Sequence, residues 1–370
     1  MKENKARVIA FYLPQYHPIP ENDKYWGKGF TEWTNVAKAK PLFRGHYQPH
    51  IPADLGFYDL RLPEVREAQA ELARDAGIEG FCYYHYWFGN GKMLLQKPFE
   101  EVLRLGKPDF PFCLCWANHD WTTKTWVKGS SMVNNTMIAQ QEYLGEQDDI
   151  KHFEYCLRAF KDHRYITIEG KPIFLIYDPL SFPNVKEFMN RWNFLAKKNN
   201  LKGIYFIGVT TGRQSSYKIV TNLGFDGVCH NRRWEAEAKA AGFRFVRRMQ
   251  SLLGWHLGIS LMKYDYNKVV RNYDTPENKL ENCYPVITPG FDRTPRAGRR
   301  AGIYVNSSPK NFKKHVAEIC KSIQDKDDDH RLVFLSAWNE WGEGNYMEPD
   351  LKWGHGYLEA LQSVVKFQIK

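Results

Sequence analysis

The sequence contains Leu332-Val333-Phe334-Leu335-Ser336-Ala337, which runs directly into Trp338-Asn339-Glu340-Trp341-Gly342-Glu343-Gly344. The first segment is mostly apolar and predicts a buried β-strand, whereas the two glycines of the second predict a turn. Glu340 and Glu343 lie among aromatic residues in that turn. Burial against rings raises the pKa of a carboxyl until it can donate a proton, while a more solvated neighbour stays ionised. We therefore expect an acid/base site at the end of this strand.

Two carboxylates three positions apart need a bend before they can act together. On an ideal strand, such positions point to opposite faces. Gly342 and Gly344 are the residues that could turn both side chains toward one centre. The simpler explanation is a pair of solvated loop acids beside tryptophans that cap a core. A third carboxylate, Glu348, follows closely, and the density of polar and aromatic groups in this short turn favours a site.

The same arrangement, an apolar run that ends in polar and aromatic residues, recurs along the chain. The predicted strands are residues 7–13, 78–87, 112–117, 172–177, 203–209, 227–230, 284–287 and 332–337. The predicted helices are residues 62–76, 99–105, 150–160, 185–198, 217–223, 310–323 and 356–370. The long segment between Pro18 and the first of these helices has no clear element, and such a loop is usually functional.

Eight strands that are apolar throughout, most of them followed by a helix, predict an α/β fold. We expect a single (β/α)8 TIM barrel with elongated βα loops, in which both faces of the parallel strands are buried. The alternative, an open doubly wound sheet, would normally carry a glycine-rich turn after its first strand, and Leu13-Pro14-Gln15-Tyr16 has no glycine. Residues 1–370 are expected to form one catalytic domain, with an insertion at about 232–282.

Composition describes a globular chain. Hydrophobic residues make up 43% and charged residues 25% of it. No run of about 18 apolar residues is present to span a membrane, and the N-terminus lacks the features of a signal peptide. We therefore expect a cytoplasmic protein. The seven scattered cysteines, an odd number, are expected to be buried free thiols of a reducing compartment.

The net charge of +10 comes partly from basic clusters at Arg232-Arg233, Arg244 to Arg248 and Asp292 to Arg300. Such clusters suit nucleic acid, an anionic membrane surface, or a phosphorylated or acidic glycan. A solvated basic face is the simpler explanation for each cluster. We expect an oligosaccharide or polysaccharide as the main partner, with an anionic or phosphorylated glycan or a membrane surface as further candidates, and no nucleic acid.

Polar and aromatic residues gather at the predicted C-terminal ends of the strands, where barrel enzymes place their chemistry. A sugar suits such groups, because its hydroxyls need donors and acceptors and its C–H face packs on a ring. Core packing is the alternative for each isolated ring. The candidate substrate-binding residues are Tyr12, Tyr16, His17, Trp33, His85, Tyr86, Trp87, Asn118, Trp121, Tyr177, Asn231, Asn339, Trp341 and Tyr346.

Metal binding has little support in the sequence. His17, His85, His119 and His230 could meet at the mouth of a barrel, but no paired His-x-His or His-Glu-x-x-His spacing is present. We therefore predict no metal and no cofactor. A Gly-x-Ser-x-Gly elbow and a phosphate-binding Walker loop are absent as well.

Five segments carry a family resemblance. They are Phe11-Tyr12-Leu13-Pro14-Gln15-Tyr16-His17, Gly29-Phe30-Thr31-Glu32-Trp33-Thr34-Asn35-Val36, Tyr84-His85-Tyr86-Trp87-Phe88, Trp116-Ala117-Asn118 and Asn339-Glu340-Trp341-Gly342-Glu343-Gly344. With them the chain resembles the WbsX family of polysaccharide-biosynthesis loci, which is often labelled glycosyltransferase. It is also similar to glycoside hydrolase family 99, the endo-α-mannosidases.

The resemblance implies a mechanism. Family 99 enzymes are metal-independent (β/α)8 barrels that cleave with retention, using two glutamates in an Asn-Glu-Trp-x-Glu-Gly motif. Glu340 then resembles the base that deprotonates the sugar 2-hydroxyl, which displaces the leaving group through a 1,2-anhydro intermediate. Glu343 resembles the acid that protonates the leaving oxygen and later activates water. Ordinary retaining enzymes instead attack with the second carboxylate, at a separation of about 5–5.5 Å.

Three functions remain open from the sequence. The first is a hydrolase that acts on α-mannoside-like or related polysaccharide linkages. The second is a glycosyltransferase of surface-polysaccharide (O-antigen or capsule) biosynthesis, and the third is a non-catalytic glycan-binding protein. The hydrolases commonly have His where this chain has Gly342, so the resemblance does not extend to an identical substrate.

Overall fold

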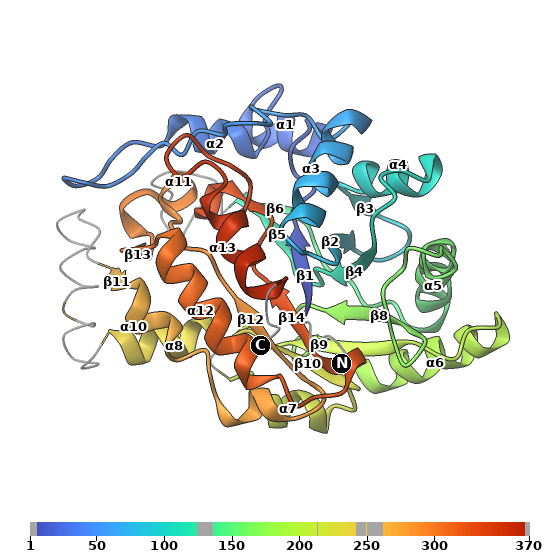
Figure 1. Cartoon of the computed structure of the whole chain (residues 1–370). Coiled ribbons are helices and arrows are strands. Elements are labelled where there is room, and N and C mark those ends of the chain that lie inside the picture. The colour runs from blue at the N-terminus through green and yellow to red at the C-terminus, as the bar shows by residue number, and fades with distance from the viewer. Residues whose placement is uncertain (1–5, 124–135, 213, 242–248, 250–261, 367–370) are drawn as a thin grey trace.

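A computed structural model describes residues 6–123, 136–212, 214–241, 249 and 262–366. Its centre is a closed barrel of parallel strands (Figure 1). Within the described residues the barrel strands are β1 (Arg7–Tyr12), β2 (Gly80–Trp87), β4 (Phe112–Trp116), β8 (Lys171–Ile176), β9 (Tyr205–Val209), β10 (Gly227–His230), β12 (Cys283–Ile287) and β14 (Leu332–Leu335). They coincide with the eight predicted strands, so the predicted (β/α)8 barrel is confirmed.

Closure of the sheet depends on β1. On one side β1 pairs with β14, with Ala10 opposite Leu335, and on the other side it pairs with β2, with Ile9 opposite Gly80. The barrel therefore has no free edge. Residues of the barrel strands are almost all buried because side chains alternate between the barrel interior and the layer of helices outside.

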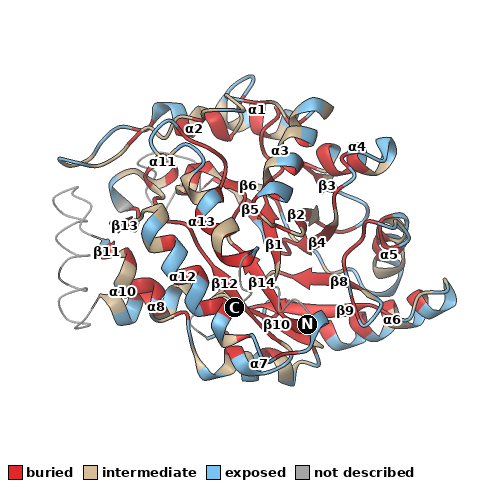
Figure 2. Ribbon diagram, viewed as in Figure 1, coloured by how far each residue is buried: buried red, intermediate tan, exposed pale blue. Residues whose placement is uncertain are grey.

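Helices surround the barrel, and each turns a buried face inward and an exposed face outward (Figure 2). They are α3 (Pro63–Asp75), α4 (Lys97–Leu105), α5 (Glu146–Phe160), α6 (Val185–Lys198), α7 (Tyr217–Asn222), α12 (Pro309–Ser322) and α13 (Gly356–Val365). The sequence explains their starts. In α12, for example, Pro309 occupies the first turn and the Ser308 hydroxyl accepts a hydrogen bond from the backbone N–H of Asn311.

The structure adds elements that the sequence did not predict. Two short helices, α1 (Pro20–Trp26) and α2 (Glu32–Lys38), lie in the segment after β1 where no element was expected. Each has only seven residues, which is too short to show a clear helical period. Short pairs of strands decorate the barrel: β3 (Met93–Leu94), β5 (Trp121–Thr122), β6 (Met137–Ala139), β7 (Thr167–Ile168), β15 (Asn339–Glu340) and β16 (Asn345–Tyr346).

The region between β10 and β12 corresponds to the predicted insertion. It holds α8 (Arg233–Ala240), β11 (Lys263–Asp265), α10 (Tyr266–Val270) and the 3-10 turn η2 (Pro276–Lys279). Strand β11 pairs in parallel with β13 (Ile303–Val305), which follows α11 (Thr294–Ala297) and the 3-10 turn η3 (Gly298–Arg300). The basic cluster Arg244 to Arg248 lies outside the described residues.

Two further expectations meet the structure here. All seven cysteines are buried and free, as predicted. Among the helices of the described residues, none has the length and apolar character needed to cross a bilayer.

Candidate active site

A cavity of about 330 Å³ opens at the C-terminal ends of the strands, and residues in or just after the C-terminal ends of all eight barrel strands line it. The two predicted catalytic glutamates face this cavity. So do four of the predicted substrate-binding residues. The six are Tyr86, Trp121, Tyr177, Asn231, Glu340 and Glu343. The sequence therefore predicted some, but not all, of the residues that line the cavity.

One arginine brings the two glutamates together. Arg296 donates from Nη2 to Glu340 Oε2 at 2.9 Å and from Nη1 to Glu343 Oε1 at 2.7 Å. Its Nε donates to Oε1 of a third carboxylate, Glu32, at 2.9 Å. Charge-assisted hydrogen bonds of this kind are the strongest that side chains make. The guanidinium therefore fixes three carboxylates around one point.

The turn after β14 explains how positions 340 and 343 come to one centre. Glu340 ends β15, residues Trp341–Glu343 form the 3-10 turn η5, and β16 then returns antiparallel to β15. Gly344 closes the turn with φ of +55°, and a side chain there would lie 2.8 Å from the Asp292 Cβ. The expected role of Gly344 as a bend is therefore confirmed.

Gly342 has a different role, which is to leave space. A Cβ at this position would lie 1.6 Å from Glu32 Oε1 and 2.9 Å from Arg296 Nε. The Glu32 carboxylate thus occupies the volume that any side chain at position 342 would need. Glu32 itself is fully buried on α2, and the sequence did not single it out as a carboxylate of the site.

Burial and the neighbouring arginines give the two glutamates different pKa values. Burial raises the pKa of Glu340 to about 7, and the negative charges of Glu343 and Glu32 add to this rise although Arg296 opposes it. Burial also acts on Glu343, but Arg296, Arg293 and Arg233 outweigh it and hold the pKa of Glu343 below its usual range. In the empty site, Glu340 is therefore the carboxyl that exchanges a proton near neutral pH, while Glu343 is ionised.

Three arginines of the cavity were read as surface residues in the sequence. Arg233, Arg293 and Arg296 belong to the clusters Arg232-Arg233 and Asp292 to Arg300, and all three line the cavity. Arg293 Nε lies 3.3 Å from Glu343 Oε1. A signal was available, because both clusters directly follow predicted strands, at the end of the barrel where the glutamates were expected.

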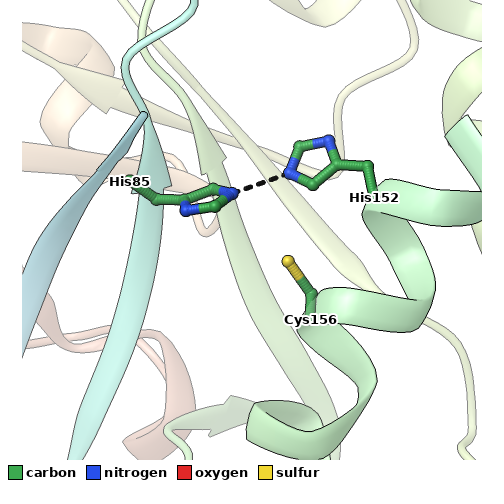
Figure 3. Close-up of side chains that lie close together, drawn as sticks. All are labelled: His85, His152 and Cys156. Carbon is green, nitrogen blue, oxygen red and sulfur yellow. Dashed lines mark hydrogen bonds between the residues drawn. The ribbon is translucent and has the colours of Figure 1, made fainter. Parts of the chain in front are cut away.

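Strand alternation decides which residues of β1 and β2 reach the cavity. Tyr84 and Tyr86 line it together with Phe11 and Leu13, whereas His85 points away. Figure 3 shows His85 directed at His152 of α5, with a hydrogen bond of 2.8 Å between their Nε2 atoms. Tyr86 was predicted to bind substrate but Tyr84 was not, although a period of two places both side chains on the same face of the strand.

His85, His152 and Cys156 form the one group in the described part of the chain whose atoms lie close enough to hold a metal ion. All three are buried, and the hydrogen bond between the imidazoles uses the lone pair that one of them would offer a metal (Figure 3). Burial lowers the pKa of His85 to about 3, so the ring is neutral. A metal bound here would lie behind the barrel wall, among residues that do not line the cavity.

Several other candidates support the site from behind instead of lining it. The amide of Asn339 bonds both backbone groups of Leu13, which ties the catalytic turn to β1. The Tyr16 hydroxyl bonds the Asn339 carbonyl and accepts from the Trp341 backbone N–H. Trp341 stacks on Tyr346 with ring centroids 3.7 Å apart. These contacts hold the turn that presents the two glutamates.

The remaining candidates also make contacts away from the cavity. The Tyr12 hydroxyl donates to Gln69, and the Trp33 indole donates to the Tyr58 carbonyl. His17 is buried and bonds the Pro14 carbonyl. The candidates that do not line the cavity are Tyr12, Tyr16, His17, Trp33, His85, Trp87, Asn118, Asn339, Trp341 and Tyr346.

Aromatic rings form the wall of the cavity opposite the arginines. Tyr86 stacks on Trp121 with ring centroids 5.7 Å apart, and Tyr177 lies 5.6 Å from the ring of His119. Flat rings beside hydrogen-bonding groups suit the apolar face and the hydroxyls of a sugar. The cavity thus combines paired carboxylates with an aromatic surface.

Comparisons with solved structures agree with this fold. The chain is similar to the GH99 endo-alpha-mannosidase from Bacteroides thetaiotaomicron, with a TM-score of 0.58 and 15% identity over 97% of this chain and 96% of that one. It is also similar to a glycoside hydrolase-like protein, with a TM-score of 0.61 and 15% identity over 98% and 94% of the two chains. At this identity the likeness shows the barrel fold alone.

Comparisons of sequence reach further. The chain is 34% identical over 361 residues to the uncharacterized protein WxcX of Xanthomonas campestris pv. campestris, strain B100, and the alignment covers 97% of this chain. The chain spans about half the length of the curated relatives it matches, since the alignment covers 50% of WxcX. The sequence model described as Glycosyltransferase WbsX matches residues 8–361. The chain therefore belongs to the WbsX glycosyltransferase family.

Proposed function

We propose that this protein is a carbohydrate-active enzyme that cleaves, or rearranges with retention, a glycosidic bond, and that Glu340 and Glu343 are its acid/base pair. The observation that carries the proposal is the contact of both carboxylates with the Arg296 guanidinium, at the bottom of a cavity with an aromatic wall. Glycosidic cleavage needs such a pair of carboxyl groups in different protonation states.

The resemblance assigns Glu340 as the base and Glu343 as the acid. A base works best when its pKa lies near the operating pH, and the pKa of Glu340, raised by burial to about 7, fits that role. Glu343 is ionised in the empty site because of its three arginine neighbours. In this assignment Glu343 must gain a proton when the glycan enters. In the reverse assignment Glu340 is the acid and Glu343 acts as an ionised base.

The substrate contacts follow from the cavity wall. We propose that Tyr86, Trp121 and Tyr177 pack against sugar rings and that Asn231 bonds a hydroxyl, because these four predicted residues face the cavity. The endo-alpha-mannosidase with the same barrel fold makes an α-mannoside-like or related polysaccharide the first substrate to test. The domain boundaries are part of the proposal: the barrel and the region at about 232–282 act as one catalytic unit.

The experiment that tests the proposal is an incubation of the pure protein with a panel of α-linked bacterial and fungal polysaccharides. New reducing ends would be measured for the wild type, Glu340→Gln and Glu343→Gln. We expect new ends from the wild type and none from either variant. Ends that persist in both variants would refute the assignment of the pair.

Activated substrates separate the acid from the base. An aryl glycoside with a good leaving group needs no protonation, so the variant of the acid keeps much of its rate on that substrate. The variant of the base does not. We expect Glu343→Gln to retain cleavage of an aryl glycoside and Glu340→Gln to lose it, and the opposite result would reverse the two roles.

A second candidate function is sugar transfer in surface-polysaccharide assembly, and the description of the family favours it. The same carboxylates would then activate an acceptor hydroxyl and not water. Consumption of a sugar donor that depends on an added glycan acceptor, with no new reducing ends, would establish transfer. A third outcome, tight glycan binding that is unchanged in Glu343→Gln and without turnover of any kind, would identify a binding protein.

A further inference from the structure

Two arginines of the cavity make few polar contacts with the described part of the protein. Arg233 and Arg293 both line the cavity. Among the described residues, neither guanidinium makes a recorded hydrogen bond. The ion pairs that they do make run through Nε, from Arg233 to Glu237 at 3.9 Å and from Arg293 to Glu343 at 3.3 Å. Their terminal Nη atoms are therefore available to a ligand.

The contrast with Arg296 shows that this arrangement is unusual for the site. Arg296 places all three of its nitrogens on carboxylates. Arg293 Nε is buried without a hydrogen-bond partner. Its nearest carboxylate oxygen among the described residues is Glu343 Oε1, at 3.3 Å, so Arg293 has fewer polar contacts than a guanidinium in this position normally makes.

Arg233 is held in place without losing its donors. It is the first residue of α8, and its guanidinium carbon lies 4.5 Å from the centre of the Phe291 ring and 4.8 Å from that of Trp234. Packing between rings fixes the plane of a guanidinium and leaves its edge free to bond in that plane. The group is thus oriented before any ligand arrives.

The charge of the site also favours an anion. The positive side chains on the cavity wall are Arg233, Arg293 and Arg296, and the negative ones are Asp120, Glu340 and Glu343. Because the pKa of Glu340 is raised by burial to about 7, this carboxyl is partly neutral at neutral pH. Arg233 and Arg293 meet their own carboxylates, Glu237 and Glu343, through Nε, so the Nη edges are the positive part of the wall that an anion could reach.

We infer that Arg233 and Arg293 form a subsite for an oxyanion carried by the sugar substrate, either the carboxylate of a uronic acid or a phosphate on the sugar. The inference rests on the proposed function, because it deepens the choice of substrate for the same cavity. The sugar ring lies against the aromatic wall of Tyr86 and Trp121, and its anionic group points at the two free guanidinium edges. Arginine suits both oxyanions, since its fork of donors matches their geometry.

The test compares acidic oligosaccharides with their carboxyl-reduced forms, which keep the same linkages but carry no charge. Calorimetry would measure the binding of α-linked oligouronates, of the reduced oligomers and of hexose 1-phosphates to the wild type, Arg233→Met, Arg293→Met and Arg271→Met. Arg271 is exposed at the end of α10 and is not among the residues that line the cavity of the two glutamates, so its variant is the control for loss of one surface charge.

We expect an acidic ligand to bind the wild type at least about tenfold more tightly than its neutral counterpart, which is the effect of one charge-assisted hydrogen bond. Arg233→Met and Arg293→Met should each reduce that ratio toward one, and Arg271→Met should not. A ratio that depends on the arginines for the uronates assigns the subsite to a sugar carboxylate. The same dependence for the hexose 1-phosphates alone assigns it to a phosphate.

The inference is overturned if neutral and acidic ligands bind equally well, or if the preference survives in Arg233→Met and Arg293→Met. Circular dichroism and melting curves of each variant exclude loss of folding as the cause. Binding and turnover are read separately, so the two proposals can fail independently. Arginine-dependent binding without cleavage of any glycan would refute the hydrolase and leave the subsite standing, whereas cleavage of neutral glycans alone would do the reverse.

Discussion

Three carboxylates in and just after the turn that follows β14 differ in what surrounds them. Glu340 and Glu343 face the cavity and share the Arg296 guanidinium. Glu348 faces away from it and accepts hydrogen bonds from the neutral groups of Tyr58, Gln69 and Trp341. Burial raises the pKa of Glu340 and of Glu348 to about 7. A raised pKa among aromatic rings therefore does not distinguish the proposed catalytic carboxyls from Glu348, whereas their position in the cavity beside a cation does.

The largest expected effect is on turnover, and it tests the difference between Glu343 and Glu348 directly. Glu343→Gln should lower turnover of unactivated glycans by about 10²–10⁴-fold, the usual contribution of general acid–base catalysis. Glu348→Gln, in the same turn, should change turnover by less than about threefold. It should instead lower the melting temperature, because the new amide cannot accept all three hydrogen bonds and a lost one costs about 1–3 kcal/mol. Comparable loss of turnover in two well-folded variants would contradict the distinction.

The next effect concerns the cation. Arg296→Met leaves three carboxylates without their shared partner, and breaking such a buried network costs about 3–5 kcal/mol of stability. It also removes the strongest influence that lowers the pKa of Glu343, so that pKa should rise. Denaturant unfolding and turnover should therefore both show large losses.

Glu32→Gln is the matched control for Arg296→Met. It removes one charge from the network but keeps an oxygen that can accept from Arg296 Nε. Its losses of stability and turnover should be much smaller. Equal losses in the two variants would show that the charge of Glu32, and not the guanidinium, organises the site.

The pH dependence of activity sharpens the comparison further. If Glu340 is the base, it must be ionised, so kcat/KM should fall tenfold per pH unit below its pKa of about 7. If Glu340 is the acid, kcat/KM should fall above that pH. Since burial gives Glu348 a pKa of about 7 as well, the profile should also be measured in Glu348→Gln. A limb that disappears in that variant would belong to Glu348 and refute the assignment.

The smallest effect compares two neighbours on β2 that point in opposite directions. Tyr86 faces the cavity, whereas Trp87 stacks on His152 and donates to Asp148 behind the wall. Tyr86→Leu should weaken glycan binding by up to about tenfold, because the sugar ring loses a flat aromatic surface, with a smaller change in melting temperature. Trp87→Phe should do the reverse. Titration of the same glycan into both variants would show whether the faces are assigned correctly.

The sequence predicted the barrel well because each strand is a continuous apolar run with polar residues at its end. It missed α1 and α2, which are short and packed through only a few side chains. It also chose His85 beside Tyr86, because both faces of a barrel strand are buried and composition alone does not distinguish inside from outside. The alternation would have separated the faces, but not told which one met the cavity.

The proposed catalytic pair could be picked out of the sequence because both glutamates lie in one short motif. Their cation was not. Arg296 is separated from Glu340 by 44 positions and from Glu32 by 264, and it stands in a basic cluster that resembles a solvated face. Only the closure of the barrel brings the loops after β1, β12 and β14 together. Contacts between residues so far apart in the sequence depend on the topology of the fold, and local sequence patterns do not predict them.

The packing of Glu32 against Gly342 has an evolutionary consequence. Because the Glu32 carboxylate fills the place of a side chain at position 342, no side chain fits at position 342 while that carboxylate stays in place. Gly342→Ala alone should destabilise the folded protein, whereas the double variant with Glu32→Ala should have room for the new methyl group. Positions 32 and 342 thus form an epistatic pair, and lineages that exchange a glycine for a larger residue in the catalytic motif must first, or at the same time, give up the buried acid.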